Sequence, residues 1–278
     1  MQPLPQTHIQ ISVQQALSED IGNGDITAQL IPVDQYLRAT ILTREPMVVC
    51  GCDWVEAAFR QCDDNVQLHW QVAEGDRVSE NTTLLQVEGP ARALLTAERT
   101  ALNFLQMLSG VATLTHTYVS RVAHTHCQIL DTRKTLPGLR LAQKYAVACG
   151  GGTNHRIGLF DAFLVKENHT QACGSIAQAA QHARKIAPDR LLEVEVETLE
   201  ELDAALAAGV DRIMLDNFDL SMMRTAVAHV AGRAPLEVSG NVNLDTVVSI
   251  AETGVNFISI GGLTKHIQAI DLSMRVSA

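Results

Sequence analysis

The stretch LLEVEVETLEELDAALAAGVDRIMLDN, residues 191–217, contains two apolar runs with a helix-type segment between them. The runs LLEVEV and RIML are rich in Val, Ile and Leu, and polar residues follow each of them. Between the runs, Thr198 and Glu201 have the spacing of a capping box, and Gly209 is suited to the end of a helix. This pattern predicts two parallel strands that are joined by a helix.

The same alternation recurs through the second half of the chain. Ser175 and Gln178 fit a capping box ahead of a helix that stops at Pro188, and Asn243 precedes another that ends at Gly254. No G-x-G-x-x-G motif follows an early strand, which argues against a dinucleotide-binding fold. The alternation therefore predicts a β/α barrel. Its strand-type runs are CQIL (127–130), AFLV (162–165), LLEVEV (191–196), RIML (212–215), LEVS (236–239) and NFISI (256–260).

The first part of the chain predicts a different architecture. The segment 96–110 is apolar on one face and predicts a helix, with Thr96 or Thr100 as its cap and Gly110 at its end. We place a domain boundary near residues 108–112. Turn signals separate the short strand-type runs that precede this helix, at 37–43, 47–51, 66–72 and 83–89.

Residues 72–90 resemble the β-rich domain of lipoyl or biotinyl carriers. Such a carrier needs a lysine to modify, and the first lysine of this chain is Lys134. We therefore interpret the N-terminal region as a scaffold without a carrier function.

Composition limits the class of protein. The chain has 278 residues and a net charge of −10, which argues against non-specific binding to nucleic acid or to an anionic membrane. It contains no apolar run long enough to span a bilayer, and its first residues lack the pattern of a secretory signal. We expect a cytoplasmic protein whose six scattered cysteines are reduced and buried thiols.

Polar residues follow every predicted strand of the second half. In a β/α barrel the carboxyl ends of the strands open onto one face, where the loops build the active site. Because six strands in succession end in this way, we expect these side chains to converge on one mouth. They are Thr132, Arg133 and Lys134; Lys166, Glu167 and Asn168; Glu195 and Glu197; Asp216 and Asn217; Ser239, Gly240 and Asn241; and Gly261 and Gly262.

Positive charge is concentrated in one segment of this acidic chain. Residues 131–166 contain six Lys or Arg but only two acids, and His155 and Arg156 lie just ahead of the second strand. Cations gathered at one site repel each other, so an anion should neutralise them, and arginine matches carboxylate or phosphate geometry. A solvated basic patch is the alternative. For the carboxylates Glu195 and Asp216, the alternative to a role in catalysis is a structural salt bridge to a neighbouring lysine.

Two turns of small residues suggest a phosphate site. SGN (239–241) and GGLT (261–264) each follow a strand and precede a helix, where backbone N–H groups can hold phosphate oxygens. Barrels often bind phosphate near their last strands. Each turn alone is a weak signal, since glycine after a strand usually marks only a tight turn.

Seven long motifs occur in a fixed order along the chain and resemble one family, that of quinolinate phosphoribosyltransferase, the carboxylating nicotinate-nucleotide pyrophosphorylase. The resemblance extends from about residue 17 to residue 265. The motifs are EDIGNGDIT (19–27), ERTALNFLQMLSGVAT (98–113), DTRKTLPGLR (131–140), KYAVxCGGGxNHR (144–156, with positions 148 and 153 variable), DAFLVKENH (161–169), EVEVET (193–198) and IMLDNF (213–218).

The resemblance implies an α/β fold with two domains. Residues 1–110 would form an N-terminal α/β sandwich, on which the C-terminal tail 266–278 packs, and residues 111–265 an open, TIM-like β/α barrel. It also implies a homodimer in which one subunit completes the active site of its partner. The reaction would join quinolinate to 5-phosphoribosyl 1-pyrophosphate with Mg²⁺, giving nicotinate mononucleotide, pyrophosphate and CO₂ for NAD synthesis.

Residue roles carry over by position in the motifs. Arg99 corresponds to an arginine that reaches quinolinate across the dimer, and Lys134, beside Thr132, to the lysine that faces pyrophosphate. Glu195 and Asp216 correspond to carboxylates on the ribose side that meet Mg²⁺ indirectly, through water or substrate. The dicarboxylate cradle would be Arg133, His155, Arg156 and Lys166; the 5-phosphate site would be Ser239, Gly240, Asn241, Gly261 and Gly262; and the residues closest to the chemistry would be Lys134, Lys166, Glu195 and Asp216.

One alternative within the same fold stays open. A paralogous phosphoribosyl- or glycosyltransferase, such as the molybdate-associated homologue, would act on another anionic acceptor. We would expect such a protein to alter the Asn-His-Arg and Val-Lys-Glu-Asn stretches, which are intact in this chain.

Overall fold

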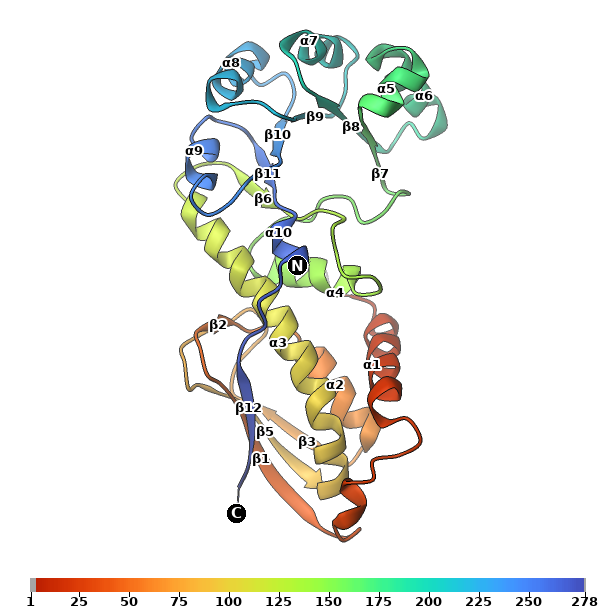
Figure 1. Ribbon diagram of the computed structural model, residues 1–278, viewed down its shortest axis with the longest axis vertical. Helices are drawn as coiled ribbons and strands as arrows, with labels where there is room; N and C mark the ends of the chain where they lie inside the picture. The colour runs from red at the N-terminus through yellow and green to blue at the C-terminus, as the bar shows by residue number, and fades with distance from the viewer. Residues whose placement is uncertain (1–3, 278) are drawn as a thin grey trace. The chain divides into compact units, whose positions relative to one another are not determined.

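Two units make up the protein in the computed structural model, which describes residues 4–277 (Figure 1). The first unit contains the chain up to His116, the segment Leu136–Gly151 and the C-terminal segment from Leu263. The second contains Thr117–Thr135 and Gly152–Gly262. The division predicted between residues 110 and 111 falls inside one continuous helix, α3 (Ala91–Val122).

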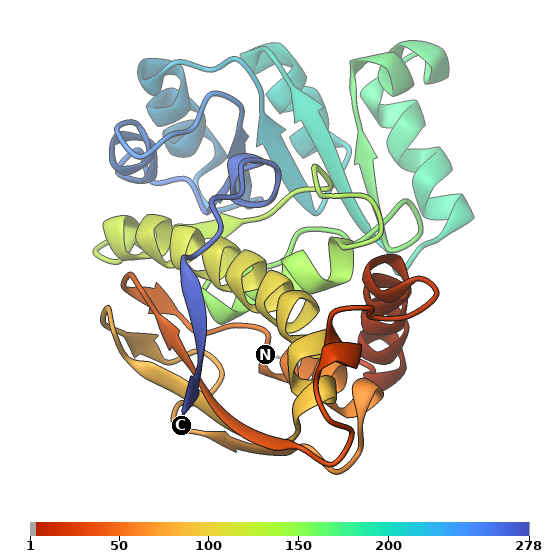
Figure 2. The same ribbon diagram turned by 60° about the horizontal axis from the view of Figure 1, so that its bottom comes forward.

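An antiparallel sheet organises the first unit, with strand order β12-β1-β5-β3. Alternate side chains of β1, Ala39, Ile41 and Thr43, are buried, as expected for a sheet with one covered face. Helices α2 (Cys52–Cys62) and α3 lie on one side of this sheet, as Figures 1 and 2 show. Strands from both ends of the described chain pair here: β1 (Tyr36–Thr43), β3 (Gln67–Trp70), β5 (Thr83–Pro90) and β12 (Leu272–Ser277).

The four strand-type runs predicted for the first part are confirmed as β1, β2 (Met47–Val48), β3 and β5. The sequence did not predict β4 (Arg77–Val78), which pairs with β2 in a separate ribbon. Helix α1 (Gln6–Ile21) packs against α2, and the indole N–H of Trp54 donates to Ser12 Oγ at 3.1 Å between them.

The predicted limits of the long helix are wrong. Helix α3 begins at Ala91, before either predicted cap, and continues through Gly110 to Val122. Gly110 does not end the helix because its role is steric: a Cβ at this position would lie 2.2 Å from the carbonyl oxygen of Gln268. The glycine lets the C-terminal segment cross the middle of α3 at close range.

Six parallel strands form the sheet of the second unit, in the order β6-β11-β10-β9-β8-β7. Helices flank its strands on the outside (Figure 1). The sheet is open because β6 and β7 are its two edges, so the predicted open, TIM-like barrel and all six of its strands are confirmed. The strands are β6 (Gln128–Leu130), β7 (Ala162–Val165), β8 (Leu191–Val196), β9 (Arg212–Leu215), β10 (Leu236–Ser239) and β11 (Phe257–Ser259).

Local signals fix the connecting helices. Ser175 Oγ accepts from the backbone N–H of Gln178, at the start of α6 (Ile176–Ile186), and Thr198 Oγ1 accepts from Glu201, so both predicted caps are confirmed. The other helices of this sheet are α5 (Glu167–Cys173), α7 (Leu199–Ala207), α8 (Leu220–Val230) and α9 (Val247–Ala251). Within residues 4–277, every helix is too short or too polar to traverse a lipid bilayer.

Candidate active site

A cavity of about 400 Å³ lies at the carboxyl ends of the parallel strands. Ten of the fourteen predicted site residues line it together. They are Thr132, Arg133, Lys134, His155, Arg156, Lys166, Glu195, Asp216, Ser239 and Gly240, and the cavity is completed by Leu164, Met214, Glu237 and Ser259.

Alternation along the strands explains how these side chains reach one cavity. Successive side chains of a strand point to opposite faces, so residues two apart share the interior of the barrel. Strand β9 contributes Met214 and, just beyond its end, Asp216, and β10 contributes Glu237 and Ser239. Val194, on the opposite face of β8 from Glu195, is fully buried. Most of the positions that face the cavity hold polar side chains, with Leu164 and Met214 as apolar exceptions.

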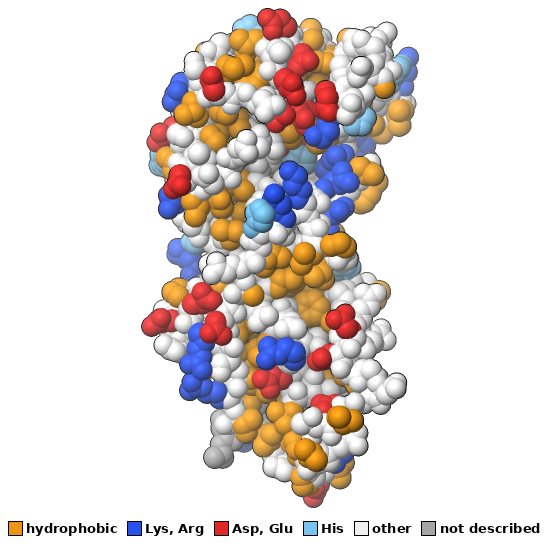
Figure 3. Space-filling view, viewed as in Figure 1, with side chains coloured by type: hydrophobic (Ala, Val, Ile, Leu, Met, Phe, Trp, Pro, Cys, Tyr) orange, Lys and Arg blue, Asp and Glu red, His pale blue; other side chains and the backbone are white. Residues whose placement is uncertain are grey.

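The positive side of the cavity contains two arginines. Burial lowers the pKa of Arg156, and the positive charge of Arg133 lowers it further. The Nε of Arg133 is buried and has no hydrogen-bond partner among residues 4–277, and neither arginine has a carboxylate within ion-pair distance in that range. Figure 3 shows Lys and Arg side chains beside Asp and Glu side chains on the visible face of this unit. Two neighbouring positive charges, one of them with an unused buried donor, make this side of the cavity a candidate site for an anion.

A buried carboxylate fixes the loop that carries His155 and Arg156. Asp131, at the end of β6, is fully buried and accepts from Asn154 Nδ2 (2.6 Å) and from the backbone N–H of His155 (2.9 Å). Asp161 accepts from the backbone N–H groups of Ile157 (2.7 Å) and of the glycine that follows it. These bonds hold the Asn-His-Arg segment in place.

His155, which lines the cavity, belongs to an ionic network that the sequence did not predict. His155 Nε2 is 2.9 Å from Glu193 Oε2 and 3.5 Å from Glu237 Oε2, and Arg212 donates to Glu237 at 3.0 Å. Both carboxylates are fully buried. A glutamate inside an otherwise apolar strand, as in LLEVEV and LEVS, is the signal that could have revealed them, because an interior charge requires a partner.

The members of this network shift each other's pKa. Burial favours a neutral His155, but the hydrogen bonds and charges of Glu193 and Glu237 outweigh it and raise the pKa of His155 to about 9. Burial raises the pKa of Glu193 to about 7, while His155 acts in the opposite direction. For Glu237, His155 overcomes the effect of burial and lowers the pKa.

The two candidate metal-side carboxylates lie on neighbouring strands. Lys166 Nζ is 2.6 Å from Glu195 Oε2, so the salt bridge considered from the sequence is present, on a lysine that also lines the cavity. Asp216 is followed by Asn217, whose left-handed backbone (φ 57°) lets its side chain donate to Asp216 at 3.2 Å. Two carboxylates that line one cavity would suit Mg²⁺, which commonly binds one or two carboxylates together with substrate phosphates.

The small-residue turns lie beside the cavity. Gly240 and Asn241 have φ of 95° and 52°. A Cβ at Gly261 would lie 2.8 Å from the side chain of Lys134, so glycine gives that lysine room. Asn241 lines an adjoining cavity of about 440 Å³ instead, and Gly262 begins α10 (Gly262–Lys265).

Arg99 is the one predicted site residue in the first unit. It lies on α3, its side chain is exposed, and it does not line the cavity of the second unit. Its assignment to a shared site stays a prediction.

Comparison with known proteins finds one family for both parts of the chain. The models for the N- and C-terminal domains of quinolinate phosphoribosyl transferase match residues 25–109 and 111–275. A probable nicotinate-nucleotide pyrophosphorylase [carboxylating] of Bacillus subtilis is 41% identical over 260 residues, covering 93% of this chain and 90% of its own. The Mycobacterium leprae enzyme named nicotinate-nucleotide pyrophosphorylase [carboxylating] is 42% identical over 270 residues, 95% of either chain.

A solved structure of a similar protein has the same fold as this chain. The nicotinate-nucleotide pyrophosphorylase from Francisella tularensis is 49% identical and superposes with a TM-score of 0.97, covering 99% of this chain and 98% of that one. Both domains of one family are therefore present in their expected order, and the chain belongs to the quinolinate phosphoribosyl transferase family.

Proposed function

We propose that the protein transfers a phosphoribosyl group from 5-phosphoribosyl 1-pyrophosphate to quinolinate with decarboxylation, giving nicotinate mononucleotide, pyrophosphate and CO₂ for NAD synthesis. The observation that carries the proposal is the convergence of cations and carboxylates on one cavity at the strand ends. A pyridine dicarboxylate and a sugar pyrophosphate are the anions that such a mixed lining would hold.

Quinolinate binds on the arginine side. Arg133 and Arg156 offer planar groups of donors that match carboxylate oxygens, and the buried Nε of Arg133 gains a partner when an anion enters. His155 lines the same cavity, and its Nε2 faces Glu193 and Glu237, so those carboxylates orient its ring. Lys166 adds a positive charge at the next strand.

The pyrophosphate and the sugar phosphate bind on the other side. Lys134, with Thr132 beside it, neutralises the pyrophosphate as it leaves. The turns 239–241 and 261–262 hold the 5-phosphate through backbone N–H groups, which glycine leaves accessible.

Glu195 and Asp216 hold Mg²⁺, indirectly through water or substrate, in this proposal. When bound, the ion neutralises pyrophosphate charge and favours its departure. The two carboxylates also face the sugar carbon, which becomes positive as its bond to pyrophosphate breaks, and they stabilise that charge.

The reaction needs no protein nucleophile. The ring nitrogen of quinolinate forms the bond to the sugar carbon as pyrophosphate departs. The positively charged nitrogen then stabilises the electron pair that remains when the 2-carboxylate leaves as CO₂, and the ring carbon takes up a proton. The protein orients the two bound reactants and stabilises the charge that develops in the transition state. Together these effects can account for a large acceleration of the reaction.

The active form in this proposal is a cytoplasmic homodimer. Arg99 is exposed on a unit that does not contribute to the cavity of the parallel sheet, which is consistent with its serving a second copy of the chain. Each active site would then need both subunits.

Substrate choice tests the proposal. With 5-phosphoribosyl 1-pyrophosphate and Mg²⁺, quinolinate should give equal amounts of nicotinate mononucleotide and CO₂, while nicotinate should give no product. Turnover of nicotinate but not quinolinate would overturn the assignment. None of the relatives named above is molybdate-associated, so no observation favours the paralogous transferase.

A further inference from the structure

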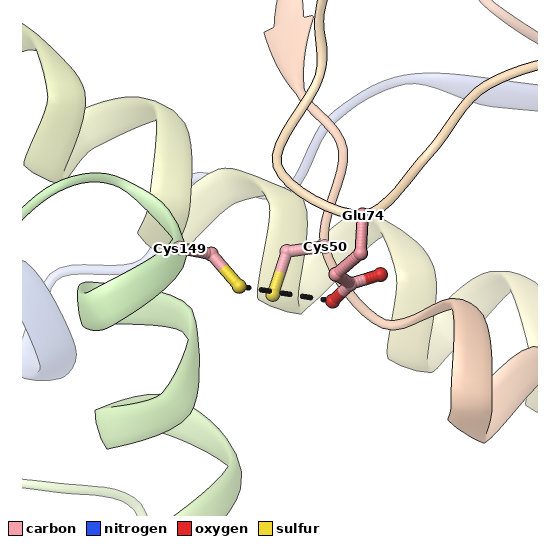
Figure 4. A group of neighbouring side chains, drawn as sticks. All are labelled: Cys50, Glu74 and Cys149. Atoms are coloured by element: carbon pink, nitrogen blue, oxygen red, sulfur yellow. Dashed lines mark hydrogen bonds between the residues drawn. The ribbon is translucent and has the colours of Figure 1, made fainter. Parts of the chain in front are cut away.

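Two thiols and a carboxylate converge in the first unit, outside the proposed active site (Figure 4). Cys50 follows β2, Glu74 lies in the turn between β3 and β4, and Cys149 is the last residue of α4 (Arg140–Cys149). One sulfur or oxygen atom from each lies within 4.8 Å of the others, and Cys149 Sγ is 3.7 Å from Glu74 Oε1.

The backbone holds these groups in place. The carboxylate of Glu74 accepts from the N–H groups of Gly51 (2.8 Å) and Cys52 (3.0 Å), at the start of α2. Cys50 is fully buried, and Ser109 of α3 bonds to both its N–H and its carbonyl group. The ligand atoms are therefore positioned before any ion arrives, which reduces the entropy cost of binding.

The charge around the thiols distinguishes between their possible roles. The charged group that faces these thiols is the carboxylate of Glu74, whose Oε1 lies 3.7 Å from Cys149 Sγ. A redox-active or nucleophilic cysteine needs positive surroundings that stabilise its thiolate. These surroundings are negative, so they favour a cation that replaces the thiol protons.

We propose that Cys50, Glu74 and Cys149 bind a thiophilic divalent ion of the Zn²⁺ type, with water as a fourth ligand. A tetrahedral Zn²⁺ with ordinary bond lengths separates a thiolate sulfur from a carboxylate oxygen by about 3.6 Å. Cys149 Sγ and Glu74 Oε1 are already at 3.7 Å. Binding releases the two thiol protons and needs no oxidant or other reactant.

Cobalt titration tests the site on the full-length, reduced protein. Co²⁺ should bind at one equivalent per chain and produce the near-ultraviolet charge-transfer band of a thiolate ligand, which Zn²⁺ abolishes by displacement. In Cys149→Ser the affinity should fall by more than about tenfold, the least that is lost when a residue supporting a ligand is removed. Cys62→Ser, which removes a thiol outside the cluster, should leave the titration unchanged.

Two outcomes would overturn the proposal: a thiolate band that Cys149→Ser leaves intact, or Co²⁺ binding without any thiolate band. The second would place the ion at sites without sulfur, such as His155, Glu193 and Glu237, which also lie close enough to share one. A measurement on the unmutated protein covers the case in which the variant does not fold. Zn²⁺ should slow alkylation of Cys149 by at least about tenfold and leave Cys62 unaffected; equal rates with and without Zn²⁺ would rule the site out.

Discussion

At the scale of single residues, the cavity is built from side chains whose charge is only partly neutralised by the protein. Lys166 forms an ion pair with Glu195. The buried Nε of Arg133, in contrast, has no hydrogen-bond partner within residues 4–277. Leaving a buried donor unpaired costs free energy, which a ligand can recover. The unpaired arginine is thus the position at which substrate binding should depend most on one side chain.

Arg133→Ala should abolish turnover and leave the protein folded. The substitution removes the charge that the substrate carboxylate meets, and it also removes a repulsion with Arg156, so thermal stability should not fall. Steady-state rates and the melting temperature measure the two effects. Arg224→Ala, on an exposed face of α8, is the control and should behave as wild type. Normal activity in Arg133→Ala would refute the anion cradle.

Phthalate, which has two carboxylates but no ring nitrogen, should compete with quinolinate and raise the melting temperature. A ligand of the native state at one hundred times its Kd adds about 2.7 kcal/mol to the free energy of unfolding. Differential scanning fluorimetry measures the shift, which Arg133→Ala should remove. A shift of equal size in that variant would mean that phthalate binds elsewhere.

At the scale of elements, single side chains join strands and helices at fixed points. Asp211, just before β9, accepts from Arg184 of α6 at 2.8 Å and from the backbone N–H of Leu192 in β8 at 2.6 Å. Gly110 performs a comparable task in α3, where it admits the segment that contains Gln268. Substitutions at Asp211 and Gly110 therefore test how strongly these contacts hold the elements together.

Asp211→Asn should lower stability at neutral pH by up to about 1 kcal/mol, because the pair is largely exposed and solvent weakens it. Burial acts to raise the pKa of Asp211, but Arg184 and the N–H of Leu192 lower it below its ordinary value. Its contribution is therefore present above the unfolded pKa of 3.8 and is lost as pH falls through the lower folded value. Urea unfolding across acidic pH measures this.

The difference between Asp211→Asn and wild type should thus shrink toward the acid end. Asp189→Asn, which removes a nearby exposed charge, is the control and should match wild type throughout. If the difference in the free energy of unfolding between wild type and Asp211→Asn grew as pH fell, the pKa of Asp211 would not be lowered in the folded protein.

Gly110→Ala should destabilise the protein by about 1–3 kcal/mol, because the new methyl group would overlap the carbonyl oxygen of Gln268. Helix propensity alone predicts the opposite sign, a gain of about 1 kcal/mol. Chemical denaturation decides between the two. Asn103→Ala, at an exposed position of the same helix, should show no such loss, and a stabilised Gly110→Ala would refute the close crossing.

At the scale of the whole molecule, the proposed dimer can be tested by complementation. Arg99→Ala and Arg133→Ala should each be inactive alone. Mixed after unfolding and refolding, they should recover about a quarter of wild-type activity, because half of random dimers are mixed and each holds one intact site of two. Two variants that damage the same half of the site, Arg133→Ala and Arg156→Ala, should show no recovery. Equal activity in both mixtures would remove Arg99 from the shared site.

The sequence by itself determined the six strands of the parallel sheet and the polar residues at their ends, but not β4 or the limits of α3. Alternating apolar runs such as LEVS and capping pairs such as Ser175 and Gln178 act between neighbours in the chain, so their pattern is visible without coordinates. The tertiary structure alone decided how deep a side chain lies and what it meets: Glu193 and Glu237 against His155, Gly110 against Gln268, and Cys50 beside Cys149 and Glu74. Those encounters join residues far apart in sequence, and their energies depend on burial and distance, which local periodicity does not contain.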